Sequence, residues 1–233
     1  MGGGDVGIDS VSTLRRSGGK IAPLKIKICG ITRLDDARAA LDAGADALGF
    51  ILYPKSKRYL APEEAAAIVA ALPLFVHTVG VTVNLAPSEL AELARIVPFS
   101  HWQLHGDETA STAAAHRALG ARRLIKALPL PWTGGTDELD RFAASGTGAF
   151  LLDTPSKEYG GTGKTFDWDL VAAFRKLTPL PLLLSGGLTP DNVAEAVARV
   201  HPYGVDVSSG VESAPGVKDH AKIRHFIAAC RQS

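Results

Sequence analysis

The sequence is poor in cysteine, in net charge and in long apolar runs. Two cysteines in 233 residues exclude a disulfide-stapled secreted scaffold and predict a reducing, cytoplasmic location. The 25 Lys and Arg against 24 Asp and Glu leave no basic excess for binding nucleic acid. The longest apolar run, residues 65–76, contains Pro73 and is shorter than the roughly 20 residues of a membrane span. We therefore expect neither a nucleic acid nor a membrane as a partner.

The first residues differ in composition from the rest. Residues 1–22 are rich in Gly and Ser and lack the apolar core of a secretory signal. A transit peptide is a weaker interpretation, because Asp5 and Asp9 stand where acidic residues are scarce in such peptides. We expect residues 1–22 to form a flexible leader and residues 23–233 to form one catalytic domain.

Eight short apolar or β-branched runs alternate with Ala- and Leu-rich amphipathic stretches. The runs are residues 24–29, 46–52, 75–83, 101–104, 123–128, 149–153, 181–185 and 204–208. Such alternation predicts a parallel sheet with helical crossovers. Eight units in about 210 residues predict an α/β fold of the (β/α)₈ TIM-barrel type. The rival is an open doubly wound sheet, but it usually has fewer strands, and no G-x-G-x-x-G follows the first run.

Helix starts are marked by proline followed by polar or acidic residues. Pro62, Pro87 and Pro190 each open such a segment, and proline at an early helical position favours helix initiation. The longest loops by this interpretation are residues 53–61 and 154–165, and both follow the carboxyl end of a strand. That end of a barrel is its catalytic face.

Two loops have the composition of a phosphate site. Ser185, Gly186 and Gly187 follow the seventh run, and a second group follows the eighth: Ser208, Ser209 and Gly210. Glycines let backbone N–H groups approach an anion, and a following helix start would add a favourable dipole. Barrels commonly hold phosphate after strands seven and eight. Residues 160–165 resemble a nucleotide-binding loop, but Glu158 stands where that motif needs glycine.

Two residues at strand ends could transfer protons. Cys29 ends the first run, and its thiolate could act as a base if nearby cations or helix termini lower the thiol pKa. Asp153 ends the sixth run after four apolar residues, whose surroundings could raise the carboxyl pKa as a general acid requires. Cys230 lies near the end of the last helical segment and is expected to be structural or incidental.

Further polar residues suggest how a ligand would be held. Arg58 belongs to a basic run after the second strand and could bind a substrate carboxylate through its guanidinium fork. Asp206 lies within the eighth run and could either orient a ligand hydroxyl or serve the structure. His77, His101 and His105 lack metal-ligand spacing, so we expect no metal. Together these features favour a phosphosugar isomerase that needs no cofactor.

Longer motifs, in order along residues 24–231, resemble the phosphoribosylanthranilate isomerase family of tryptophan biosynthesis. They are KICGITR at 27–33, GF at 49–50 with SKRY at 56–59, QLHG at 103–106, LDT at 152–154 with GGTGKTFDW at 160–168, LSGGL at 184–188 and VDVSSGVE at 205–212.

This resemblance implies an Amadori rearrangement of a phosphoribosyl substrate. Asp153 would be the general acid that opens the ribose ring, and Cys29 would be the general base that removes the C2 proton. Arg58 would hold the anthranilate carboxylate, and the amides of the two Gly- and Ser-containing loops would hold the phosphate. The resemblance leaves open whether the protein is a monomer or a homodimer.

Two alternatives remain at this point. A related barrel isomerase of histidine biosynthesis performs the same rearrangement on another ribotide, but that family relies on an Asp in the first strand, where this chain has Cys29. A catalytically silent phosphoribosyl binder would need neither Cys29 nor Asp153. Because barrels host many chemistries, the fold alone does not distinguish between these hypotheses.

Overall fold

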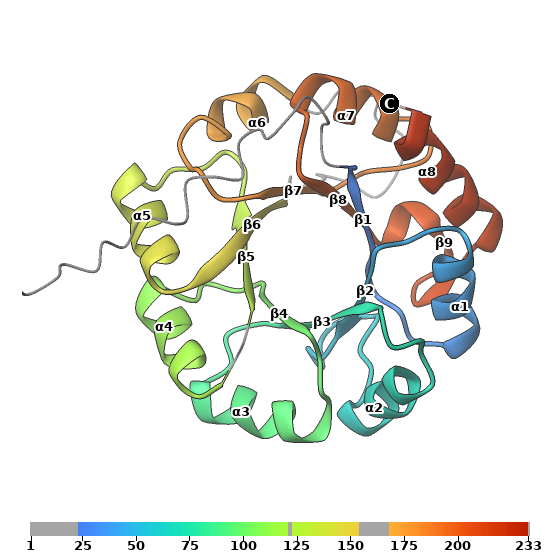
Figure 1. The fold of residues 1–233 in the computed structure, drawn as a ribbon, viewed down its shortest axis with the longest axis horizontal. Helices are drawn as coiled ribbons and strands as arrows, with labels where there is room; N and C mark the ends of the chain where they lie inside the picture. The colour runs from blue at the N-terminus through green and yellow to red at the C-terminus, as the bar shows by residue number, and fades with distance from the viewer. Residues whose placement is uncertain (1–22, 121–122, 154–167, 233) are drawn as a thin grey trace, which may run out of the picture.

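The computed structural model describes residues 23–120, 123–153 and 168–232. Its main sheet is a closed barrel of eight parallel strands in sequence order, β1 to β8, with the helices arranged in a ring outside it (Figure 1). This confirms the predicted α/β barrel. The predicted leader, residues 1–22, and the loop from 154 to 167 lie outside the described residues.

The observed elements follow the predicted alternation. The barrel strands are β1 Lys25–Ile28, β2 Ala47–Ile51, β3 His77–Thr82, β4 His101–Leu104, β5 Leu124–Pro129, β6 Thr147–Asp153, β7 Leu182–Ser185 and β8 Gly204–Val207. The helices are α1 Leu34–Asp42, α2 Pro62–Ala70, α3 Pro87–Ile96, α4 Ala110–Ala118, α5 Thr136–Ala144, α6 Trp168–Phe174, α7 Val193–Val200 and α8 His220–Gln232.

Two of the three predicted helix starts are confirmed. Pro62 and Pro87 are the first residues of α2 and α3. In each case a Glu at the third helical position accepts a hydrogen bond from the backbone N–H of the residue before the helix, at 3.3 Å in α2 and 2.7 Å in α3. The prediction for Pro190 is wrong, because α7 begins three residues later at Val193.

The strand boundaries differ from the predicted runs where apolar residues leave the sheet. The third run was expected to begin at Phe75, but β3 begins at His77 and the side chains of Leu74 and Phe75 are fully exposed. Two short strands were not predicted. They are β9 Glu212–Ala214 and β10 Val217–Lys218, which pair antiparallel as a hairpin after β8 and a 3₁₀ turn, η1 Ser209–Val211.

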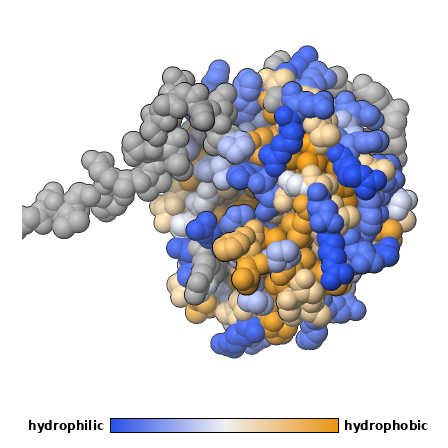
Figure 2. Space-filling model, turned by 45° about the vertical axis from the view of Figure 1, so that its right-hand side comes forward, coloured by the Kyte–Doolittle hydropathy of each residue, from blue (hydrophilic) through white to orange (hydrophobic). Residues whose placement is uncertain are grey.

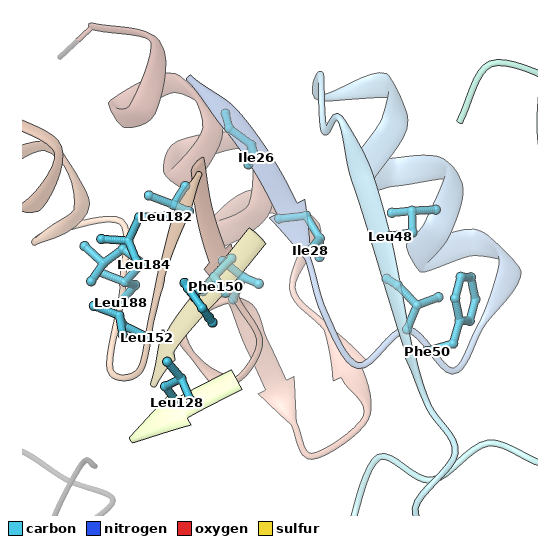
Figure 3. Packing of buried hydrophobic residues seen from close by; sticks show 14 of the residues in the cluster. Ile26, Ile28, Leu48, Phe50, Leu128, Phe150, Leu152, Leu182, Leu184 and Leu188 are labelled. Carbon is cyan, nitrogen blue, oxygen red and sulfur yellow. The ribbon is translucent and has the colours of Figure 1, made fainter. Parts of the chain in front are cut away.

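Alternation along the strands separates two apolar layers. The larger cluster contains the side chains that face the helices, including Ile26 and Ile28 of β1, Leu48 and Phe50 of β2, and Leu184 of β7 (Figure 3). A smaller cluster fills part of the barrel interior and consists of Val79, Ile125, Ala127, Leu151 and Leu183. Because successive strand residues point to opposite faces, residues between members of the outer layer point into the barrel.

The interior is therefore apolar on one side and charged on the other. The smaller cluster comes from β3, β5, β6 and β7, whereas Lys27 of β1 and Asp206 of β8 stand between members of the outer layer. Outside the barrel, hydrophilic residues cover much of the face in Figure 2, with a band of hydrophobic ones through its middle. No helix in the described ranges is long and apolar enough to cross a membrane.

Candidate active site

Cys29 lies at the carboxyl end of the barrel, directly after β1. The strand ends at Ile28, one residue earlier than predicted, and the N–H of Cys29 donates to the Val207 carbonyl oxygen at 2.8 Å. The residue is 6% exposed. Burial raises the pKa of the thiol, and the Lys27 ammonium opposes that rise. The expected cation is present, but its effect on the thiol pKa is smaller than that of burial.

Asp153 is the last residue of β6 and pairs in register with Ser185 of β7. Its side chain is 43% exposed, so the expected apolar surroundings are not found there. Oδ2 of Asp153 lies 3.3 Å from Nε2 of His105. The apolar residues before Asp153 pack elsewhere, because Leu151 lies in the barrel interior and Leu152 in the outer layer.

His105 connects Asp153 to the interior. Its Nδ1 lies 2.7 Å from Nε2 of Gln103, a fully buried residue of β4. When the Gln103 amide donates to Nδ1, the imidazole proton is on Nε2 and faces the Asp153 carboxyl. In the sequence analysis, His105 was considered only as a metal ligand and was not recognised as a site residue. Its spacing from Gln103, two residues along a strand, was the available sign that both side chains share the inner face.

The loop that carries His105 is braced by a buried ion pair. Lys126 of β5 donates to a Glu108 carboxylate oxygen at 3.1 Å and to the Gly106 carbonyl oxygen at 2.6 Å. Glu108 in turn accepts from the backbone N–H groups of Gly106 and Asn84 at 2.9 and 2.8 Å. These bonds satisfy the polar groups of the turn and fix the position from which His105 reaches Asp153.

Arg58 is held by Glu212 through two parallel hydrogen bonds. Its Nε and Nη2 donate to the two Glu212 oxygens at 2.8 and 2.7 Å. Lys218 donates to Glu212 Oε1 at 2.9 Å, and the carboxylate is almost fully buried. Glu212 engages the Nε side of the guanidinium, so a ligand carboxylate would meet its Nη1–Nη2 end. Lys218 and Glu212, which belong to the unpredicted hairpin, were missed as site residues.

The two loops expected to bind phosphate lie against each other. Gly186 and Gly187 have positive φ angles of 86° and 62°, as the predicted turn requires. A Cβ on Gly210 would collide with the Leu188 carbonyl oxygen, so glycine permits the close approach of the two loops. The expected dipole of a following helix is not observed after β7, because α7 begins only at Val193. After β8, Ser209 and Gly210 belong to the single turn of η1.

Gly30, the residue after Cys29, lies next to Arg58 and to the candidate phosphate loop at Ser208. Its φ is 72°, and a Cβ there would lie 2.7 Å from Cδ of Arg58 and 2.8 Å from Oγ of Ser208. Ser208 also accepts a hydrogen bond from Lys218 to its carbonyl oxygen at 3.2 Å. The residue after Cys29 therefore lies under both the candidate carboxylate-binding side chain and the candidate phosphate loop.

Asp206 does not stand open at the mouth. It is 4% exposed, and its Oδ1 accepts a hydrogen bond from Lys27 at 2.9 Å inside the barrel. This geometry favours the structural or electrostatic role over direct contact with a ligand hydroxyl. In the described part of the chain, no three His, Cys, Asp or Glu side chains cluster in a way that could hold a metal ion. Cys29 and Cys230 do not form a disulfide.

Comparison with known proteins identifies what the chain is similar to. Residues 26–229 match the family model described as N-(5'-phosphoribosyl)anthranilate (PRA) isomerase. The curated N-(5'-phosphoribosyl)anthranilate isomerase of Geobacter sulfurreducens is 49% identical over 205 residues, which are 88% of this chain and 97% of that protein.

Two solved structures extend the comparison. A phosphoribosyl anthranilate isomerase in complex with reduced 1-(o-carboxyphenylamino)-1-deoxyribulose 5-phosphate is 41% identical, with a TM-score of 0.75, and covers 90% of this chain and 100% of its own. A structure of monomers generated from the dimeric enzyme of Thermotoga maritima is 38% identical, also with a TM-score of 0.75 and with the same coverage.

We predict that Glu212→Gln changes how the free energy of unfolding depends on pH below neutrality. Burial acts to raise the pKa of Glu212, but the hydrogen bonds from Arg58 and Lys218 outweigh it, so the pKa lies below 4.5 in the folded protein. The stabilisation is complete above pH 4.5 and is lost as the pH falls through the lowered folded pKa. Urea unfolding between pH 7 and pH 3 should show a smaller acid-induced loss in the variant. An unchanged pH dependence would contradict this account.

Proposed function

The chain belongs to the N-(5'-phosphoribosyl)anthranilate isomerase family, and from that premise we propose which of its side chains carry out the reaction. The protein is an isomerase of tryptophan biosynthesis. It converts N-(5-phosphoribosyl)anthranilate to 1-(2-carboxyphenylamino)-1-deoxyribulose 5-phosphate. The observation that carries the residue assignment is the placement of a thiol and a carboxyl group, Cys29 and Asp153, at the carboxyl ends of β1 and β6.

Asp153 is the general acid of the first step. Its protonated carboxyl gives a proton to the ribose ring oxygen, the bond from that oxygen to C1 breaks, and the nitrogen lone pair forms a C1=N bond. The exposure of Asp153 and its contact with His105 at 3.3 Å support this role, since the carboxyl group can reach a ligand and can recover a proton. His105 is the group placed to assist that recovery.

Cys29 is the general base of the second step. Its thiolate takes the C2 proton, the C–H electrons form a C1=C2 bond, and the C=N electron pair returns to nitrogen. The resulting enolamine loses its hydroxyl proton and gains a proton at C1, which gives the ketone. One proton has passed from Asp153 to the substrate and one from the substrate to Cys29, so exchange with solvent restores both groups.

The substrate's two anionic ends are held apart across the mouth. Arg58, oriented by Glu212, binds the anthranilate carboxylate through its guanidinium. The phosphate lies against the backbone amides of the two touching loops, at Gly186, Gly187, Ser208, Ser209 and Gly210. The surroundings of Gly30 support this arrangement, because the residue after Cys29 lies next to both Arg58 and Ser208. No cofactor or metal enters any of these steps.

The alternatives considered for the sequence are less well supported. An isomerase of histidine biosynthesis is not favoured, because family membership points to the anthranilate substrate. A silent binder has no use for a thiol placed with a buried cation beside it. We propose residues 23–233 as the catalytic domain. Two cysteines without a disulfide support the proposed cytoplasmic location.

We also propose that the protein forms a homodimer, as the related Thermotoga maritima enzyme does. Leu74 and Phe75, in the loop between α2 and β3, are 94% and 101% exposed. His77, two residues later, lines a hollow of about 630 Å³ whose wall is part apolar, with Phe99 and Trp102, and part polar, with His101 and Arg123. A projecting apolar loop beside a hollow can pair with the same region of a second copy in a twofold interface.

The catalytic assignment predicts large losses of turnover. Cys29→Ser and Asp153→Asn should each lower kcat by at least about 10²-fold, the low end for a general acid or base. The assay is the fall of anthranilate fluorescence with freshly generated substrate. Cys230→Ala removes the other thiol, in α8, and should keep wild-type turnover if it remains folded. Near-wild-type turnover in either active-site variant would refute that residue's role.

The carboxylate-binding role of Arg58 predicts a different kinetic signature. Arg58→Ala should mainly raise KM, by about 10- to 100-fold, as expected for loss of a hydrogen bond to a charged group. Because this change leaves Glu212 with Lys218 alone, Arg58→Lys serves as the companion variant that keeps a positive charge. An unchanged KM in both variants would exclude Arg58 as the carboxylate-binding group.

The proposed dimer interface predicts that substitutions in the loop of Leu74 and Phe75 halve the mass of the protein in solution without unfolding it. Leu74→Ser combined with Phe75→Ser should convert a dimer into a monomer in sedimentation equilibrium at micromolar concentration. Leu177→Ser, at a partly exposed leucine after α6, is the matched control and should remain dimeric. A monomeric wild-type protein, or a double variant that stays dimeric, would contradict the proposal.

A further inference from the structure

A buried ion pair inside the barrel lies next to Cys29 and has no role in the mechanism described so far. Lys27 of β1 and Asp206 of β8 are register partners at the seam that closes the barrel. Lys27 Nζ lies 2.9 Å from Asp206 Oδ1, and the two side chains are 3% and 5% exposed. Burial acts against the charge on Lys27, but Asp206 and Cys29 together outweigh it and raise the lysine pKa. The ion pair with Asp206 therefore favours the charged form of Lys27 in the interior.

Strand geometry brings Cys29 to the same cation. Lys27 and Cys29 are two residues apart along β1 and its direct continuation, so both side chains point to the barrel interior. The Lys27 ammonium donates a hydrogen bond to Asp206, and its charge also acts on the Cys29 thiol. Lys27 is thus shared between a thiol and a carboxylate that compete for its positive charge.

Gly49 of β2 provides the space in which the thiol and the ammonium meet. A Cβ at this position would lie 2.7 Å from Cys29 Sγ and 3.0 Å from Lys27 Nζ. Real Cβ atoms essentially never come within 3.0 Å of another heavy atom without a shift in the structure. The absence of a side chain at Gly49 therefore leaves room for both the Cys29 thiol and the Lys27 ammonium beside β2.

The charges around the thiol act in opposite directions. Burial has the largest effect on the Cys29 pKa and raises it, Lys27 lowers it, Asp206 raises it, and Lys218 of β10 lowers it. Arg58 is a further cation near Gly30, the residue after Cys29. On the β2 side, the residue next to the thiol is Gly49, which has no charge. Lys27 is the leading stabiliser of the thiolate among these groups.

We propose that Lys27 is a positioning residue that favours ionisation of Cys29 against the opposing effect of burial, and that Asp206 sets how much of the lysine charge the sulfur receives. The proposal rests on the assignment of Cys29 as the base. A structural purpose alone explains the pair poorly, because well-packed apolar residues in place of a buried ion pair are often neutral or stabilising. Beside a thiol that must ionise in a buried site, the cation has a chemical purpose.

The test is the pH dependence of Cys29 alkylation in the full-length protein. Iodoacetamide reacts with the thiolate, so its rate follows ionisation. A Cys230→Ala background leaves Cys29 as the single thiol in the chain. Lys27→Met should shift the alkylation profile to higher pH and Asp206→Asn should shift it to lower pH. Each shift should be about one pH unit, which is about a tenfold change in thiolate fraction below the pKa.

Opposite shifts distinguish an electrostatic role from a structural one. Lys25→Met removes another ion-paired lysine of β1 and should leave the profile unchanged. If Lys27→Met fails to fold because Asp206 is left alone, Lys27→Met combined with Asp206→Asn removes both charges. That double variant should be less reactive than Asp206→Asn alone.

Several results would overturn the proposal. These are an unchanged profile in Lys27→Met, shifts of the same sign in both single variants, or a double variant as reactive as Asp206→Asn alone. The catalytic role of Cys29 is tested separately by turnover of Cys29→Ser, because alkylation reports ionisation whether or not the thiol serves as the base. Failure of the base assignment and failure of the Lys27 proposal are therefore distinguishable.

Discussion

The hydrogen bonds that join β1 to β8 are the constraint on which the rest of the site depends. They close the barrel, set Lys27 opposite Asp206 in register, and continue one residue further, where the Cys29 N–H donates to Val207. A slip of one residue in this pairing would send Lys27 and Cys29 to the helix-facing layer. Closure of the sheet thus determines which of the chain's chemical groups face the interior.

Buried ion pairs lie beside candidate site residues around the barrel mouth. Lys27 and Asp206 lie below Cys29 in the interior, where exclusion of water strengthens their effect on the thiol. Glu212, held by Lys218, orients Arg58 above it. On the other side, Lys126 and Glu108 fix the loop that carries His105 toward Asp153. Three buried pairs thus lie beside Cys29, Arg58 and the loop of His105, and His105 in turn contacts Asp153.

Local sequence patterns were sufficient for the barrel and for the two strand-end residues. The eight runs are buried strands in the predicted order, and Cys29 and Asp153 could be proposed as site residues because strand ends face the mouth. The partners of Arg58 and Asp153 could not be predicted from local patterns, because Glu212 and His105 are 154 and 48 residues away from them in the chain. The β9–β10 hairpin was missed because its strands are only three and two residues long. The start of α7 was misplaced because Pro190 precedes it by a turn.

The central claim is that Asp153 opens the ring and Cys29 then removes the C2 proton, so the two groups act in different steps. The most direct measurement is the kinetic isotope effect with substrate deuterated at C2 of the ribosyl group. In Cys29→Ser, proton removal becomes the slow step and the isotope effect on kcat should be large. In Asp153→Asn, ring opening becomes slow and the effect should fall towards unity. A large isotope effect in Asp153→Asn together with none in Cys29→Ser would contradict the account.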